Sequence, residues 1–389
     1  MNPPLAGVRV LDLTELLPGP TCSWYLADLG ADVVRIQEPT AIRARRRGTT
    51  AENAIERRAS TIYGRNKRSL ALNLKDERGV EVFLQLVDGA DVVLEAFRPG
   101  VARRLGIDYS TVAARNPRIV YASITAFGAT GPLRDLPGFD PNACAIAGAI
   151  AATGDRDGRP VILGVPLADV ASGLHAAFGI VCALRVRDAT GLGQHVDVSM
   201  LDAVMAFMGL HAARYFQTGA ATSRERISLA VLPPLETKDG KYVVSVNEEP
   251  RHWASFCRAL DREDLIAQQQ SSPNRQREIF AELQAASRTY TQEEWLHLGR
   301  QFGFPVAPML ETNEVFEHPQ VRARELVLEV TGDGGQTERQ LGFPVKLSRT
   351  PAAYRHGTPE RGQHTDEILA EAGLDAAAIQ SLRRARVVE

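Results

Sequence analysis

The sequence predicts an α/β fold, with a doubly wound, Rossmann-like large domain and a smaller α+β domain. Short β-branched segments alternate with segments of helical spacing through about residue 125, and glycines and prolines separate them. The composition changes near residue 226, where an isolated strand is followed by a polar stretch of helical spacing. The chain has 389 residues, enough for two domains with substantial cores.

The composition is that of an ordinary globular protein, with 44% hydrophobic and 24% charged residues. The formal net charge is −2, and Arg43–Arg47 is a short arginine cluster, interpreted as a solvated loop or a local anion site. We therefore expect no nucleic-acid partner. There is no Cys-x-x-Cys pair, no signal-like start and no apolar run of about 18 residues, so we expect a cytoplasmic protein with reduced, buried thiols and no membrane partner.

The first 36 residues predict a β–turn–α–β unit. Residues 8–13 have the apolar, β-branched character of a buried strand, and helical spacing follows Pro18-Gly-Pro20. Gly30 ends that helix, and residues 31–36 form a second strand. Such units build parallel sheets. The first turn lacks the Gly-x-Gly-x-x-Gly spacing, so we expect no nicotinamide or flavin dinucleotide.

The alternation continues along the chain. The predicted elements are a helix over 77–86, a strand over 91–95, a helix beginning at 101–105, a strand over 119–124, a helix over 142–152, a strand over 195–199 and a helix over 201–215. Residues 40–64 fit neither period and are interpreted as a long excursion. Because ligands of doubly wound sheets bind beyond the carboxyl ends of the strands, the residues after each strand are candidate binding residues.

The predicted domain boundaries follow from these elements. We place the large domain at residues 1–200, completed by 335–389, a linker at 201–225, the small domain at 226–312 and a return linker at 313–334.

One acidic residue, Asp169, follows an apolar run. It comes after Pro166 and before residues 170–184, which have the pattern of a buried, almost wholly apolar helix. The spacing predicts that Asp169 is the N-cap of this helix. A helix N-terminus also keeps a carboxylate ionised where little water reaches it, as a carboxylate nucleophile requires. The spacing does not decide between a structural cap and a nucleophile.

Several motifs, in order, resemble those of the class III CoA-transferases, a family that includes formyl-CoA:oxalate and carnitine CoA-transferases and, as a branch, the α-methylacyl-CoA racemases. The resemblance covers nearly the whole chain. The motifs are Leu5–Leu13, Pro18–Pro20, Leu29–Ile36, Asn66–Lys75, Ala90–Gly100, Asn116–Tyr121, Pro137–Asp140, the Asp169 segment and Gly191–Gln194.

The resemblance implies a CoA-transferase that moves CoA between an acyl-CoA donor and a carboxylic acid. Asp169 would be the nucleophile, through an aspartyl anhydride and an aspartyl-CoA thioester. Coenzyme A would be a substrate, with no tightly bound cofactor and no metal, and the protein would be an interlocked homodimer. The candidate CoA-binding residues are Leu17, Pro18, Arg35, Leu72, Lys75, Ala96, Phe97, Arg98, Arg104 and Leu105.

Two alternatives stay open. In the racemase branch, Asp169 would carry a proton, with a partner glutamate in the small domain and a histidine before the aspartate of the Gly-x-Asp motif. Here that position is Phe139, which has no titratable group. The second alternative is an acyl-CoA-binding protein without catalytic activity.

Two further acidic residues are candidates for the site. Glu249 lies in a segment that resembles the one carrying the racemase glutamate, and Pro250 after it predicts a helix start instead. Asp140, followed by Pro141, is a candidate cap of the next helix or a partner of Asp169 in the acyl pocket.

Overall fold

The computed structural model describes residues 1–47, 61–154, 158–221, 228–331 and 337–389. The chain divides into two compact units. The larger unit comprises Met1–Thr153, Pro160–Thr222 and Glu325–Glu389, and the smaller unit comprises Gly154–Arg159 and Ser223–Arg324.

A six-stranded parallel sheet forms the centre of the larger unit, in the order β3-β2-β1-β4-β5-β6. The strands are β1 (Arg9–Asp12), β2 (Asp32–Gln37), β3 (Lys67–Ala71), β4 (Val92–Glu95), β5 (Val120–Thr125) and β6 (His195–Ser199). Val10 of β1 is paired with Val33 on one side and Val92 on the other. The strand order therefore reverses at β1, as in doubly wound folds, and the predicted α/β class with a parallel sheet is confirmed.

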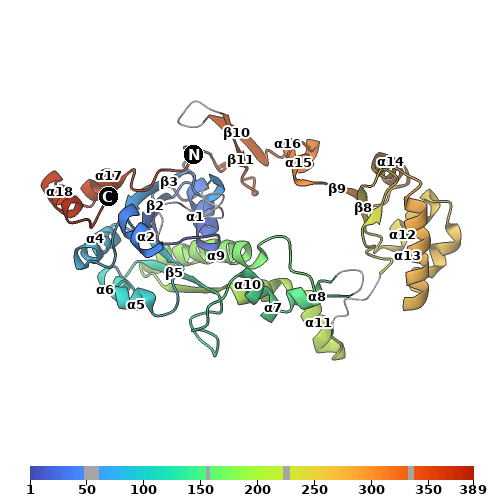
Figure 1. Ribbon diagram of the computed structural model, residues 1–389, viewed down its shortest axis with the longest axis horizontal. Coiled ribbons are helices and arrows are strands. Elements are labelled where there is room, and N and C mark those ends of the chain that lie inside the picture. The colour runs from blue at the N-terminus through green and yellow to red at the C-terminus, as the bar shows by residue number, and fades with distance from the viewer. Residues whose placement is uncertain (48–60, 155–157, 222–227, 332–336) are drawn as a thin grey trace. The chain divides into compact units, whose positions relative to one another are not determined.

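Helices cover both faces of this sheet (Figure 1). Val10 packs into one hydrophobic core with α1 (Pro18–Asp28) and α9 (Leu167–Thr190). Its neighbour Leu11 packs into a second core, to which α17 (Thr365–Glu371) contributes. Successive strand residues point to opposite faces, so burial on both faces produces the continuous apolar runs seen in the sequence.

The remaining elements of the larger unit connect these strands or follow the smaller unit. They are α2 (Thr40–Arg47), α4 (Glu77–Asp88), α5 (Val101–Leu105), α6 (Tyr109–Arg115), α7 (Asp140–Ile146), α8 (Ala149–Ala152), α10 (Met200–Phe207), α11 (Gly209–Thr218), the antiparallel pair β10 (Val327–Thr331) and β11 (Thr337–Leu341), and α18 (Ala376–Arg384).

Several sequence predictions for this unit were wrong. Residues 40–47 form α2 instead of an irregular excursion, while residues 48–60 lie outside the described residues. The helix predicted over 142–152 is interrupted at Gly148, whose φ of +86° favours glycine, and the helix predicted over 201–215 is divided at Met208. Cys182 is exposed, although the other three cysteines are buried as predicted.

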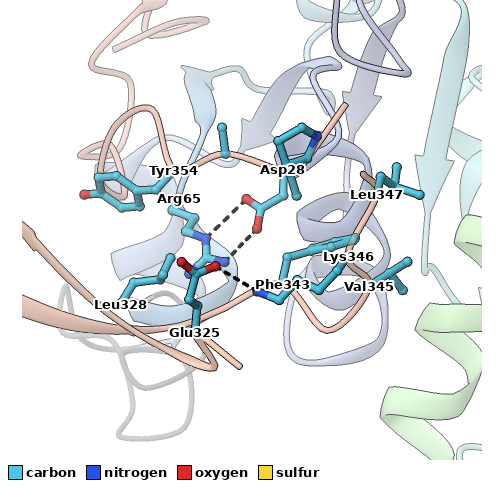
Figure 2. Close-up of a pocket in the computed structure, with 12 residues that line it drawn as sticks. Asp28, Arg65, Glu325, Leu328, Phe343, Val345, Lys346, Leu347 and Tyr354 are labelled. Carbon is cyan, nitrogen blue, oxygen red and sulfur yellow. Dashed lines mark hydrogen bonds and ion pairs between the residues drawn. The ribbon is translucent and has the colours of Figure 1, made fainter. Parts of the chain in front are cut away.

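A buried ion pair fixes the chain where it returns after β11. Arg65 and Asp28 lie 2.6 Å apart, with side chains only 1% and 2% exposed, and Arg65 also donates to the carbonyl of Leu341. Figure 2 shows the pair at a pocket of about 120 Å³. Asn66 donates to the carbonyl of Ala353 in the same returning segment. Removing one partner of such a pair strands a buried charge, at a cost of about 3–5 kcal/mol.

The smaller unit has its own core beside a three-stranded antiparallel sheet in the order β7-β8-β9. Trp253, Phe256 and Trp295 stack in this core, with ring centroids 5.6–5.8 Å apart. The elements are β7 (Leu235–Glu236), β8 (Tyr242–Ser245), α12 (Pro250–Ala259), the 3₁₀-helix η1 (Glu263–Gln268), α13 (Pro273–Ser287), α14 (Gln292–Phe302), β9 (Val306–Met309), α15 (Thr312–Val315) and α16 (Pro319–Ala323).

Helix α9 is also long and apolar enough to cross a membrane, by length and composition alone. Half of its most apolar stretch is buried inside the larger unit. Core helices that pack on a sheet commonly meet the same criterion, so this is weak evidence for a membrane span.

Candidate active site

Asp169 lies in the first turn of α9, but it is not the N-cap. The helix begins at Leu167, and Pro166 is the N-cap residue, so the predicted cap was wrong by three positions. Pro166 has no side chain that could accept a hydrogen bond from the helix. The N–H groups at the start of α9 therefore need an acceptor from another part of the chain.

Asp140 provides this acceptor from a different helix. Its Oδ2 accepts the N–H of Ala168 at 2.6 Å and the N–H of Asp169 at 3.2 Å. Asp140 is the first residue of α7, and the N-cap of α7 is Phe139, so the prediction that Asp140 caps its own helix was wrong. The two N–H groups are occupied and are not free to bind an oxyanion formed at Asp169.

The surroundings of Asp169 disfavour its charge. Burial and, next, the negative charge of Asp140 raise the pKa of Asp169 from 3.8 to about 6. Cys144 lies beside the same carboxylates, with Sγ 3.7 Å from Asp140 Oδ1, and burial followed by the charge of Asp140 raises its pKa to about 11. At pH 7 the Asp169 carboxylate is mostly ionised, whereas the Cys144 thiol keeps its proton.

The N-terminus of α1 packs against the face of α9 that carries Asp169. Gly173, one turn further along, makes this approach feasible, because a Cβ there would lie 2.5 Å from the carbonyl oxygen of Pro18. Residues four apart share a helix face, so Asp169 points toward the same region. Tyr63, whose phenol bonds to Thr21 of α1, has a raised pKa because of its burial and, in addition, the nearby charge of Asp169.

A pocket of about 450 Å³ opens at the carboxyl ends of β1 to β4. This is where the strand order reverses, the usual ligand position in doubly wound sheets. Five of the candidate CoA-binding residues line it: Leu72, Lys75, Ala96, Phe97 and Leu105. The sequence analysis did not single out the other lining residues, which are Leu13, Glu15, Leu16, Ile36, Gln37, Glu38, Asn73, Leu74 and Val101. Most of these lie at or just after the carboxyl end of a strand, so the general position of ligands in doubly wound sheets is enough to identify them.

The remaining candidate CoA-binding residues are absent from the pocket lining. Leu17 and Pro18 begin α1 directly after the lining residue Leu16, and Arg35 lies on β2 directly before Ile36. Arg98 and Arg104 are exposed. Lys75 is the only basic side chain among the described lining residues, and it is 60% exposed and lies 3.2 Å from Glu38.

The turn between β1 and α1 connects the pocket to the region of Asp169. Its Leu16 lines the pocket, whereas the next residues contact α9. Buried polar groups hold this turn: Asp12 accepts the hydroxyls of Thr14 and Ser23, both at 2.5 Å, and Lys67 donates to Ser23 at 2.6 Å. Burial lowers the pKa of Lys67 to about 8, and the charge of Asp12 opposes this shift.

Glu249 belongs to the smaller unit. It is the N-cap residue of α12, and Pro250 is the first helical residue, as the sequence predicted. Its carboxylate lies 2.6 Å from Nε of Arg251, with both side chains more than half exposed. A catalytic role for Glu249 stays a prediction. Among the described residues there is no cluster of His, Cys, Asp or Glu that could hold a metal ion.

Comparison with known proteins identifies the class. The profile of CoA-transferase family III matches residues 5–365, so the chain belongs to this family and is a class III CoA-transferase. A succinyl-CoA:mesaconate CoA-transferase from Haloarcula marismortui is 33% identical, covering 95% of this chain and 97% of that protein. The human succinyl-CoA:glutarate CoA-transferase is 32% identical, covering 99% and 90%.

Solved structures agree with this assignment. A CaiB/BaiF family protein from Brucella suis superposes with a TM-score of 0.83 at 28% identity, covering 96% of this chain and all of that one. A hypothetical protein from Mycobacterium tuberculosis superposes with a TM-score of 0.81 at 30% identity, covering 95% and 100%.

We expect Asp169→Asn to stabilise the fold at pH 7.5 but not at about pH 4. The folded pKa, about 6, lies above the ordinary value of 3.8, so the folded state binds the proton more tightly. The stability gained from protonating Asp169 is fully present below about pH 4 and is lost as the pH rises through 6. At pH 7.5 the buried charge therefore destabilises the fold, and the uncharged Asn removes that charge. Thermal unfolding at both pH values checks it, with the exposed Asp135→Asn as the control. An equal change in Tm at both pH values would contradict the raised pKa of Asp169.

We expect Ala96→Trp to raise KM for acyl-CoA at least tenfold, with a smaller effect on kcat. The indole would occupy part of the pocket at the carboxyl ends of the strands. Initial rates over a range of acyl-CoA concentrations measure the effect. The matched control is Ala377→Trp on the exposed surface of α18. An unchanged KM in the Ala96 variant would mean that CoA does not bind in this pocket.

Proposed function

We propose that Asp169 is the nucleophile with which this class III CoA-transferase takes up the acyl group of an acyl-CoA. The observation that carries the proposal is the environment of this carboxylate. It is half-buried and has a pKa raised to about 6. Only the turn between β1 and α1 separates it from the pocket at the strand ends. A carboxylate that is ionised at pH 7 but poorly solvated is suited to nucleophilic attack.

The reaction conserves the energy of the thioester. Asp169 Oδ attacks the acyl carbon, the C–S bond breaks, CoA leaves as a thiolate, and a mixed anhydride between Asp169 and the acyl group remains. The thiolate then attacks the aspartyl carbonyl carbon, which releases the donor acid and leaves an aspartyl-CoA thioester. The acceptor carboxylate reverses these two steps and leaves as the new acyl-CoA. Because every intermediate is an activated acyl group, no ATP is needed.

We place the nucleotide part of CoA in the pocket at the ends of β1 to β4. Leu72, Ala96, Phe97 and Leu105 supply an apolar wall for the adenine, and Lys75 is the cation at its edge. The pantetheine arm would then follow the turn between β1 and α1 to reach Asp169. The exposed Arg98 and Arg104 stay candidates for the phosphates.

The first substrates to test are succinyl-CoA with glutarate or mesaconate. The relatives from Haloarcula marismortui and human carry these compounds in their names. In this proposal CoA is a substrate and no cofactor is tightly bound. The racemase alternative is less well supported, because Phe139, 64% exposed, has no group that could exchange a proton with the substrate.

Trapping with hydroxylamine tests the nucleophile. Incubation with succinyl-CoA and hydroxylamine should produce a hydroxamate at Asp169, located by peptide mass spectrometry. Asp169→Asn should form none and should lose CoA exchange by at least a thousandfold, whereas Asp188→Asn, an exposed control, should behave as the wild type.

Two results would contradict the proposal. One is CoA exchange at full rate by Asp169→Asn. The other is solvent deuterium at the acyl α-carbon of a branched acyl-CoA without any acyl exchange, which would point to the racemase chemistry instead. Binding of acyl-CoA with neither reaction would point to a binding protein.

We further propose that the protein is an interlocked homodimer in the cytoplasm. Exposed apolar side chains on α9, Leu174, Phe178 and Val181, recur at helical spacing and so share one face, and Leu210 and Phe216 of α11 are more than 80% exposed. An extended apolar surface of this kind usually marks an interface, and two-fold pairing is the commonest arrangement of soluble oligomers. The absence of disulfides among the four cysteines supports a reducing compartment.

Sedimentation equilibrium at micromolar concentration should give twice the chain mass of 42.4 kDa. Phe178→Glu should shift the protein toward the monomer, because it places a charge on the apolar face of α9. Ala377→Glu on α18 is the control. A wild-type protein of monomer mass would contradict the proposed dimer.

A further inference from the structure

The carboxylate of Asp140 is bound to the helix that carries Asp169 and not to its own helix. Its Oδ2 accepts the N–H groups of Ala168 and Asp169, and its Oδ1 lies 3.7 Å from Sγ of Cys144. These contacts fix the carboxylate beside the first turn of α9. All three donors are neutral, so they position the charge of Asp140 without neutralising it.

Gly138 is required for this position. A Cβ at residue 138 would lie 2.7 Å from the ring of Phe127 and 2.8 Å from the Cβ of Ala126. Only glycine therefore fits at position 138, two residues before Asp140. The N–H of Phe139 then donates to the side chain of Asn142 at 3.0 Å, which fixes the start of α7. The Gly-x-Asp sequence thus places one carboxylate at a defined point.

The charge of Asp140 opposes the ionisation of Asp169. Burial and Asp140 both raise the pKa of Asp169, and no cation among the described residues offsets them. Two other titratable groups interact with the charge of Asp169, Cys144 of α7 and Tyr63. Both have raised pKa values and are uncharged at neutral pH. The ionised Asp169 therefore faces a like charge and no compensating one.

We propose that Asp140 is a positioning residue that holds the first turn of α9 and raises the energy of the free Asp169 carboxylate relative to its acylated forms. This inference rests on the proposed function. When Asp169 Oδ bonds to the acyl carbon and CoA leaves as the thiolate, the aspartyl group becomes an uncharged anhydride, and its repulsion by Asp140 ends. The same is true of the aspartyl-CoA thioester. Asp140 thereby shifts the equilibrium from the free Asp169 carboxylate toward its acylated forms.

Two substitutions separate the roles of Asp140. Asp140→Asn keeps an oxygen that can accept the two N–H groups and removes the charge, whereas Asp140→Ala removes both. The rate at which Asp169 is acylated in a single turnover with succinyl-CoA is measured without hydroxylamine, by acid quench and peptide mass spectrometry, between about pH 4.5 and 8.5. In the wild type it should rise with a midpoint near 6. In Asp140→Asn the midpoint should fall, and the rate at pH 7.5 should drop roughly tenfold with little change in KM.

Asp140→Ala should show the same loss together with a lower Tm. The matched control is Asp375→Asn, which makes the same chemical change at a cap that accepts the N–H of Ala378 in α18. It should leave the midpoint and the rate unchanged.

Three outcomes overturn the inference. If Asp140→Asn acylates with the wild-type midpoint and rate, Asp140 is a helix cap only. If Asp375→Asn shifts the midpoint equally, the effect is not specific to Asp140. If the wild type forms no hydroxamate at all, the proposed function fails and this inference fails with it, a result distinct from the first two.

Discussion

The hydrogen bonds from the first turn of α9 to Asp140 connect the proposed nucleophile, Asp169, to the rest of the fold. A helix that begins after proline has no side chain of its own to accept its first N–H groups, so a second helix supplies the carboxylate. That helix can approach only because Gly138 leaves room, and α1 can approach α9 only because Gly173 does. The position of Asp169 is thus set by the Asp140 side chain of α7 and by the close backbone approach of α1 to α9.

The pocket and the proposed nucleophile lie on either side of one turn. Both lie next to the turn between β1 and α1. A buried network of hydrogen bonds and an ion pair among Asp12, Ser23 and Lys67 stabilises that turn. Burying a lysine is unfavourable, as the lowered pKa of Lys67 shows, and the hydroxyl and carboxylate around it offset part of that cost. A fixed turn suits a cosubstrate whose two ends must be held a set distance apart.

The sequence predicted the parts of the structure that depend on local pattern. The strands β1, β2, β4 and β5 are apolar on both faces, so each produces an apolar segment that the sequence pattern identifies as a strand. Strand β3 was not identified, because Lys67 and Arg68 are polar residues that are acceptable there only through partners distant in the chain, Asp12 and Asp32. The cap of α9 was misassigned for the same reason: the acceptor, Asp140, lies 29 residues away from Asp169. Half of the candidate CoA-binding residues line one pocket, because the family motifs follow strand ends.

The discontinuous larger unit has a consequence for how the protein is made. One of its two sheet cores contains Ile368, Leu369, Ile379 and Val387, and Val388 is bridged to the pocket residue Leu72. A ribosome emits the amino-terminal part of a chain first, so the sheet and much of the pocket are synthesised while one face of the sheet still lacks part of its cover. Folding of this unit is therefore completed only after residues 365–388 have emerged, and a nascent or truncated chain without them exposes part of an apolar core next to the pocket.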